Sequence, residues 1–110
     1  MAYDEELAHR VRELLGGIAG VGEKPMFGGL AFMVGGHMAV CVSGRGGLMV
    51  RVPPDETDAL TAREHVEPMV MAGKETRGWV RVSLDGLTTK RQLRGWVDRG
   101  ARYAAGLPRT

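Results

Sequence analysis

The sequence predicts one α+β domain with a mostly antiparallel sheet and helices packed on it. Three observations indicate this class: an amphipathic segment at each end of the chain, apolar residues with a period of two between them, and no regular alternation of strand and helix. Runs of strands flanked by helices are typical of α+β domains. The expected element order is α-β-β-β-α-β-β-α. The 110 residues, taken as a single domain over residues 1–110, suffice to bury one core.

The first predicted helix covers residues 4 to about 16. Asp4 is a suitable N-cap because its carboxylate accepts a hydrogen bond from a free N–H of the first turn. Gly16-Gly17 ends the helix, since glycine readily adopts the left-handed conformation of a C-cap. The apolar residues recur at steps of three and four, which places them on one stripe. This stripe consists of Leu7, Val11, Leu14, Leu15 and Ile18.

From Glu23 to Val52 the period is two, and the segment predicts three strands, with Met26-Phe27 upstream on the same run as the first. Gly35-Gly36 predicts a two-residue hairpin turn after the first strand, and Gly44-Arg45-Gly46-Gly47 predicts a four-residue loop after the second. Gly28-Gly29 predicts a bulge or kink upstream. Pro53-Pro54 ends the run, because proline cannot donate to a sheet.

These loop lengths set an expected register in which Phe32 pairs with Ala39, and Cys41 pairs with Val50. Both faces of the sheet are then apolar. One face carries Leu30, Phe32, Val34, Ala39, Cys41, Leu48, Val50 and Val52. The other face carries Ala31, Met33, Met38, Val40, Val42, Met49 and Arg51.

The second half of the chain predicts a short helix, a hairpin and a long helix. Residues 55–63 form the short helix, and residues 68–83 form the hairpin around a loop at 73–77. Thr89 and Gln92 have the spacing of a capping box and begin the last helix. The buried face of this helix carries Leu93, Trp96, Val97, Gly100, Ala101 and Ala104.

The composition is that of a globular domain with little overall charge. Hydrophobic residues make up 44% and charged residues 25%, which argues against disorder. A net charge of +2 gives little general attraction to polyanions. Cys41 is the single cysteine, so no internal disulfide forms, which fits a reducing compartment. The start of the chain is acidic, and no apolar run approaches the roughly 20 residues of a membrane helix, so we expect a cytoplasmic protein.

Three motifs occur in order along the chain. Met26-Phe27-Gly28-Gly29-Leu30-Ala31-Phe32 opens the first strong strand, Gly78-Trp79-Val80 lies in the second hairpin, and Trp96-Val97 lies in the last helix. Together they resemble the TfoX/Sxy N-terminal domain family over nearly the whole chain. The resemblance implies a secretion-chaperone-like α+β fold and a regulatory background. Longer members are positive regulators of natural competence that act with a cyclic-AMP receptor protein and carry a second, helical C-terminal domain. We expect this chain to be a stand-alone N-terminal domain, and the family supplies no catalytic residues.

We expect no catalytic site, cofactor or metal. His37 and Cys41 are four residues apart on a predicted strand, roughly 13 Å along it, whereas zinc ligands lie about 2.0–2.3 Å from the metal. The glycine-rich segments contain neither a phosphate-binding loop nor a dinucleotide-binding fingerprint. No serine has the G-x-S-x-G context of a hydrolase. A small enzyme without a recognisable motif is the least favoured class.

The last helix is the candidate nucleic-acid surface. A row of basic side chains on a helix can neutralise phosphates. An ordinary solvated helix face also explains the row, because Arg94, Asp98 and Arg102 are i,i+4 neighbours. A nucleic-acid-binding transcriptional regulator is therefore the alternative function. The candidate contacts are Lys90, Arg91, Arg94 and Arg102.

The methionine-bearing sheet face is the favoured contact surface. Three short helices cannot cover both apolar faces, and methionine recurs on binding surfaces because its side chain is flexible. We therefore expect a non-enzymatic regulatory module that contacts a second copy of itself or another protein, such as a transcription regulator. The expected interface residues are Met33, Met38, Val40 and Met49.

Overall fold

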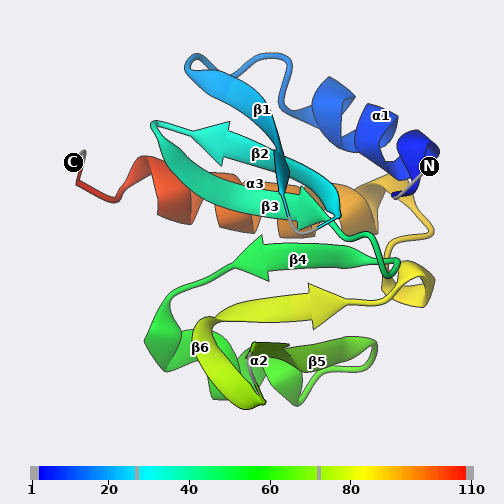
Figure 1. The fold of residues 1–110 in the computed structure, drawn as a ribbon, viewed down its shortest axis with the longest axis vertical. Coiled ribbons are helices and arrows are strands. Elements are labelled where there is room, and N and C mark those ends of the chain that lie inside the picture. Colours follow the sequence, from blue (N-terminus) through cyan, green and yellow to red (C-terminus); the bar gives the residue numbers. More distant parts are fainter. Residues whose placement is uncertain (1–2, 27, 72, 109–110) are drawn as a thin grey trace.

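Figure 1 shows the computed structural model, which describes residues 3–26, 28–71 and 73–108. Within these residues the chain forms a six-stranded antiparallel sheet in the order β1-β2-β3-β4-β6-β5. The α+β class and the broad order of elements are therefore confirmed. The elements are α1 (Glu5–Leu14), β1 (Val21–Met26), β2 (Gly29–Val34), β3 (His37–Val42), β4 (Leu48–Arg51), the 3-10 turn η1 (Pro54–Glu56), α2 (Thr57–Thr61), β5 (Val66–Met71), β6 (Lys74–Val82), the 3-10 turn η2 (Leu84–Gly86) and α3 (Lys90–Ala105).

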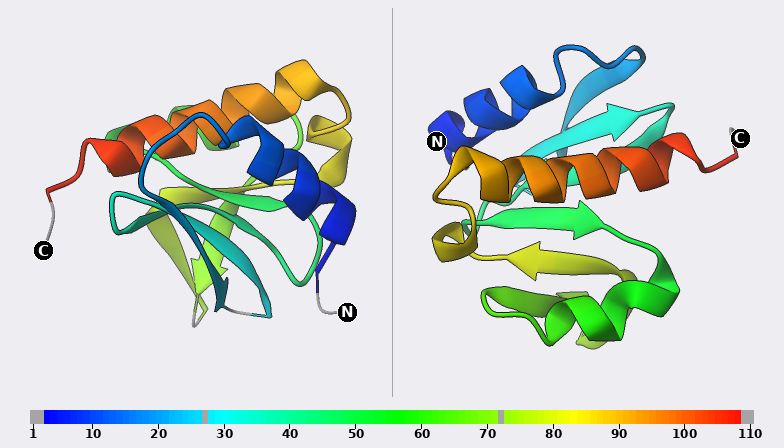
Figure 2. Two further views of the ribbon diagram at one scale, coloured as in Figure 1. Left: turned by 90° about the horizontal axis from the view of Figure 1, so that it is seen from above. Right: turned by 180° about the vertical axis from the view of Figure 1, so that it is seen from behind.

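Helices α1 and α3 cover one face of the sheet, as the view from above in Figure 2 shows. The two predicted N-caps are confirmed. Asp4 accepts a hydrogen bond from the backbone N–H of Leu7 at 3.0 Å, and Thr89 and Gln92 form a complete capping box. Trp96 is buried in this layer, as the apolar stripe predicted. Helix α2 lies beside β5 and β6 at the far end of the sheet (Figure 1).

The register of β3 differs from the expectation because this strand carries a bulge. The two-residue turn at Gly35-Gly36 is confirmed, with both glycines at positive φ. Beyond the turn the pairing shifts by one residue, so that Phe32 pairs with Val40 and Ala39 is the extra residue. Val40, expected on the methionine face, therefore lies in the main core under the helices.

The loop between β3 and β4 is also one residue shorter than expected. The N–H of Ser43 donates to the carbonyl of Gly47 at 3.1 Å, which leaves three residues in the loop. Val42 therefore pairs with Leu48 and lies in the main core. Cys41 lies on the opposite face, the reverse of the expected assignment.

Strand β1 is a separate strand, antiparallel to β2, whereas the sequence placed Met26 upstream on the same run with a bulge or kink at Gly28-Gly29. It forms the edge beside β2, and its central residues are exposed. Its sequence contains Gly22, Lys24 and Pro25, so no apolar alternation marks it. An edge strand buries little surface and needs few apolar side chains, which explains why the sequence pattern is silent here.

The second hairpin is longer than predicted, and it bends at Gly78. Lys74 and Met71 are paired across the turn, so four of the five residues expected as a loop, 74–77, are the first part of β6. Gly78 has φ +94°, a conformation that favours glycine, and its N–H donates to the Thr57 hydroxyl at 2.9 Å. After the bend, β6 pairs with β4 from Trp79 onward. The glycine of the Gly78-Trp79 motif thus has a structural role.

Helix α3 touches the sheet backbone at Gly100. A Cβ atom at this position would lie 2.5 Å from the carbonyl oxygen of Ala39 and 2.9 Å from the side chain of Val40. A hydrogen in place of a side chain therefore allows the helix to lie directly on the bulge of β3. Gly95, one and a half turns earlier on the same helix, is exposed, and a Cβ there would meet no atom within 4 Å.

These two glycines give a matched pair of substitutions. We expect Gly100→Ala to destabilise the protein by about 1–3 kcal/mol, because the methyl group collides with the backbone of β3. We expect Gly95→Ala to stabilise it by about 0.5–1 kcal/mol, since alanine is the better helix former and the site is open. Thermal melting of both variants against the parent measures this, and equal melting shifts would contradict the close contact.

Candidate interaction surfaces

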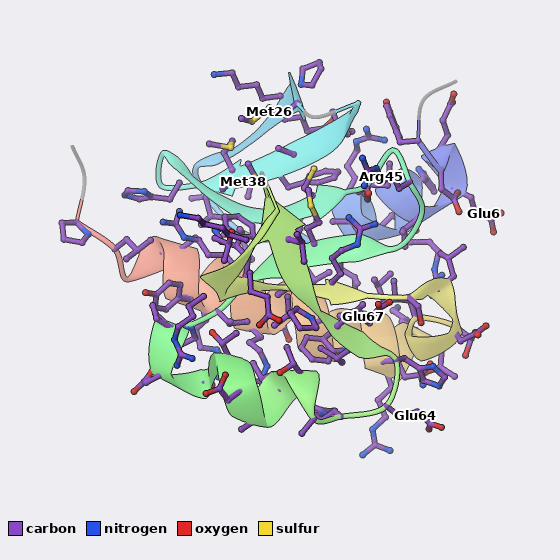
Figure 3. All side chains as sticks on the ribbon, turned by 60° about the horizontal axis from the view of Figure 1, so that its bottom comes forward. Glu6, Met26, Met38, Arg45, Glu64 and Glu67 are labelled. Carbon is purple, nitrogen blue, oxygen red and sulfur yellow. The ribbon has the colours of Figure 1, made fainter. Side chains whose placement is uncertain are left out.

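The sheet face opposite α1 and α3 carries a second, sulfur-rich apolar cluster. Its buried members are Ala31, Cys41, Met49 and Met69. Met69 belongs to β5 and reaches this cluster because the β5–β6 hairpin curls over this face. Figure 3 shows Met26 and Met38 on this side of the sheet, with the hairpin crossing in front. The partly buried side chains that border the cluster are Met26, Met33, Met38 and Trp79.

The four predicted interface residues therefore have different environments. Met33 and Met38 are cross-strand partners and remain partly exposed at the border of the cluster. Met49 is only 4% exposed and is part of the second core. Val40 is fully buried under α3. The pattern of alternating residues could not distinguish these cases, because it contained no sign of the bulge that turns Val40 towards α3 or of the hairpin that covers Met49.

Trp79 is fixed at the border of the cluster by its neighbours. Arg51 is its partner on β4, and the guanidinium carbon of Arg51 lies 5.5 Å from the centroid of the Trp79 ring. This distance is typical of a cation–π contact.

A row of directly paired residues crosses the same face from the β1 edge to the β5 edge. The row consists of Lys24, Ala31, Cys41, Met49, Arg81 and Glu67.

The histidine and cysteine considered for a metal site do not meet. His37 contacts the backbone carbonyl oxygen of Pro108 through Nε2 at 2.7 Å, whereas Cys41 is buried in the second cluster. Among residues 3–26, 28–71 and 73–108, the side chains of histidine, cysteine, aspartate and glutamate form no group of three suited to a metal ion.

The motif residues of the first strand are explained by packing and backbone geometry. Phe32 is fully buried, and Gly28 has φ +72°. A Cβ at Gly29 would lie 2.1 Å from the carbonyl oxygen of Val42, so only glycine allows β2 and β3 to pair here. Phe27 lies outside the described residues.

The basic residues of α3 are divided among three hollows instead of forming one row. Lys90 and Arg94 line a hollow of about 580 Å³ between α3 and α1, together with Arg10 and Glu13. The other two hollows have volumes of about 360 Å³ each and lie on either side of Arg99. One of them is lined by Arg91 and the other by Arg102.

Two arginines lie over the ring of Trp96, in the hollow that Arg91 also lines. The guanidinium carbons of Arg63 and Arg99 lie 5.0 and 5.7 Å from the ring centroid of Trp96. Arg99 also donates to Glu56 at 3.1 Å. The sequence pattern gave no sign of Arg63, because it lies between α2 and β5, 33 residues before Trp96. Only the fold brings these side chains together.

Among the described residues, no helix combines the length and the apolar character needed to cross a bilayer.

We expect the thiol of Cys41 to be unreactive in the folded protein. Burial raises its pKa to about 11, with Arg81 acting weakly in the opposite direction. At pH 8 about one thiol in a thousand is then ionised, and the nucleophilic form is the thiolate. A disulfide reagent such as Ellman's reagent should release colour slowly in native buffer and at once in denaturant. Rapid labelling of the native protein would contradict the buried position.

Comparison with known families gives one match. Residues 13–104 match the family described as the TfoX N-terminal domain, which is most of the chain. The searches of curated proteins and of solved structures gave no match. The matched range runs from the end of α1 to the last turn of α3, and includes the bulge, the Gly78 bend and Trp96. The chain belongs to the TfoX N-terminal domain family.

Proposed function

We propose that this chain is a non-enzymatic regulatory module that acts through protein contacts, and that it self-associates through its methionine surface. We define the methionine surface as Met26, Met33, Met38 and Trp79. The observation that carries the proposal is that these side chains remain partly exposed around an already buried apolar cluster. A second copy of the chain would extend this cluster.

The chemistry of the surface suits an adaptable contact. Thioether side chains have three rotatable bonds and fill irregular gaps between two surfaces. Met33 and Met38 lie side by side on neighbouring strands, so one contact can bury both. Tryptophan is enriched at the centre of protein interfaces, and Trp79 is held in place by Arg51. A standard interface of roughly 800 Å² per partner would need further residues around this centre.

The charges at the two ends of the paired row favour a second copy. Lys24 is at the β1 end and Glu67 is at the β5 end, and both are exposed on the same row. A two-fold axis parallel to the strands would place Lys24 of each copy opposite Glu67 of the other. The charges in such an isologous contact are complementary.

The edges of the sheet are less suited to association than its face. Strand β1 contains Pro25 and strand β5 contains Pro68, and each of these is an edge strand. Proline has no N–H to offer to an added strand, and it is a common means of blocking edge pairing. The contact is therefore assigned to the face of the sheet.

The proposal that the chain is not an enzyme is supported by its buried polar groups. Ser43 and Thr57 are buried, and each has a hydrogen bond that holds a loop or strand in place. Thr57 accepts from Gly78 at the bend of β6, and Ser43 accepts from Arg45 in the β3–β4 loop.

The single thiol, Cys41, is buried and fits a reducing compartment such as the cytoplasm.

Substitutions on and beneath the methionine surface test the contact. We expect the parent to form a dimer at high micromolar concentration in analytical ultracentrifugation. Met38→Glu and Met33→Glu should be monomeric and melt within a few degrees of the parent, because their side chains reach solvent. Met49→Glu is the control for the core, and should lose about 3–5 kcal/mol because it buries an unpaired charge.

Two outcomes would refute this proposal. If Met38→Glu melts as far below the parent as Met49→Glu does, the methionine surface is core. If the parent is monomeric at high concentration, the chain does not self-associate through this surface.

A nucleic-acid-binding regulator is the second candidate, favoured by the cationic hollow between α1 and α3. Lys90, Arg94 and Arg10 line it together with Glu13. We expect no specific DNA binding by the isolated chain, because its net charge is only +2 and its basic residues are divided among several hollows. Competition between promoter and random duplexes measures this. A preference of about 10³ or more, typical of specific binders, would refute the expectation.

A further inference from the structure

We propose that a groove along α3 binds an extended acidic segment of a partner protein. This arginine groove consists of the two hollows on either side of Arg99, which are lined mainly by Arg63, Arg91, Gly95, Trp96, Arg102 and Tyr103. It lies on the helix-covered side of the sheet, opposite to the methionine surface. The proposal rests on its own observations and stands or falls separately from self-association.

The groove has the size and shape for short side chains. Each hollow has a volume of about 360 Å³, within the range of roughly 300–1,000 Å³ that small ligands occupy. Arg91 and Arg102 mark its ends, and eleven residues of helix at about 1.5 Å each separate them by roughly 16 Å. About five residues of extended peptide cover that length, at roughly 3.3 Å per residue.

The lining of the groove is predominantly cationic and made of arginine. Among the described residues, neither Arg63 nor Arg91 forms an ion pair, whereas Arg99 is paired with Glu56. The planar guanidinium group binds a carboxylate through two parallel hydrogen bonds. Because Arg63 and Arg99 are held against the ring of Trp96, they lose less freedom on binding than mobile side chains would.

The turn that carries Arg63 is fixed by a left-handed residue. His65 has φ +69°, which is uncommon outside glycine and costs conformational energy. Its carbonyl oxygen accepts from the N–H of Ser83 at 2.9 Å, which ties the turn to the end of β6. A Cβ at Gly86 would lie 2.9 Å from the Cβ of His65, so Gly86 packs directly against the turn. Arg63 therefore projects over Trp96 from a fixed backbone.

Gly95 is the observation that points to a ligand. It borders both hollows, and it lies exposed in the middle of α3 where glycine weakens a helix. No neighbouring atom requires its small size, in contrast to Gly100 on the same helix. What glycine provides at this place is an unobstructed floor that joins the two hollows. Such a floor allows another chain to approach the helix backbone closely.

The observations favour an acidic peptide over nucleic acid. Glu56 and Glu64 line the hollows beside the arginines, and a continuous phosphate backbone would meet their negative charge. Separate carboxylate side chains can enter each hollow and avoid them. The net charge of +2 also gives weak general attraction to a polyphosphate.

The test measures binding of a fluorescein-labelled hexaglutamate peptide by anisotropy at low salt, with hexaglutamine as the neutral control. The expected result is saturable, salt-sensitive binding of hexaglutamate and none of hexaglutamine. Gly95→Leu should weaken binding by about tenfold or more because it fills the floor, while Gly95→Ala should change it by less than about twofold. Alanine and leucine are both good helix formers, so neither substitution should disrupt α3.

A second pair of variants separates the groove from general charge. Arg91→Gln should weaken hexaglutamate binding by about fivefold to tenfold, the loss expected for a charge-assisted contact. Arg94→Gln removes the same charge from the same helix, but Arg94 lines the hollow between α1 and α3, outside the groove. This substitution should leave binding within about twofold.

The proposal is overturned if hexaglutamate shows no saturable binding at millimolar protein, or if Arg91→Gln and Arg94→Gln weaken it equally. It is also overturned if Gly95→Leu binds as the parent does. If random duplex DNA at the same salt binds more tightly than hexaglutamate, or inorganic phosphate competes as effectively as unlabelled hexaglutamate, the groove serves phosphate instead of an acidic protein segment.

Discussion

The approach of Gly100 to the carbonyl group of Ala39 is the contact on which both sides of the sheet depend. Ala39 is the extra residue of the β3 bulge, and the bulge turns Val40 towards α3 and Cys41 away from it. A larger residue at position 100 would lift the helix from the strand. The bulge therefore decides which residues of β3 enter the main core and which enter the sulfur-rich cluster, and the absence of a side chain at Gly100 lets α3 pack directly on it.

The two proposed surfaces are separated by the thickness of the domain. The methionine surface borders an apolar cluster and offers flexible side chains, whereas the arginine groove is charged and held rigid by Trp96 and the His65 turn. The first is suited to association through apolar area, and the second to recognition of charge. The two proposed contacts would therefore not compete for the same surface.

The sequence was informative wherever structure depends on neighbours along the chain. The N-caps at Asp4 and Thr89, the Gly35-Gly36 turn and the stripe that buries Trp96 could all be predicted, because each involves residues within a few positions. The sheet register could not, since no residue near Ala39 in the sequence marks the bulge in β3. The arginine groove could not either, because Arg63 reaches Trp96 only through the tertiary fold.

The position of α3 at the end of the element order has a consequence for synthesis of the chain on the ribosome. Its buried stripe, which extends to Ala104, covers the centre of the sheet. The antiparallel neighbours β1 to β4 can pair as soon as they emerge, because each follows the previous one along the chain. Until α3 leaves the exit tunnel, α1 alone covers part of their apolar face. Exposed apolar surface on a partly folded chain favours aggregation, so the part of this face beneath α3 stays vulnerable until α3 has packed on it.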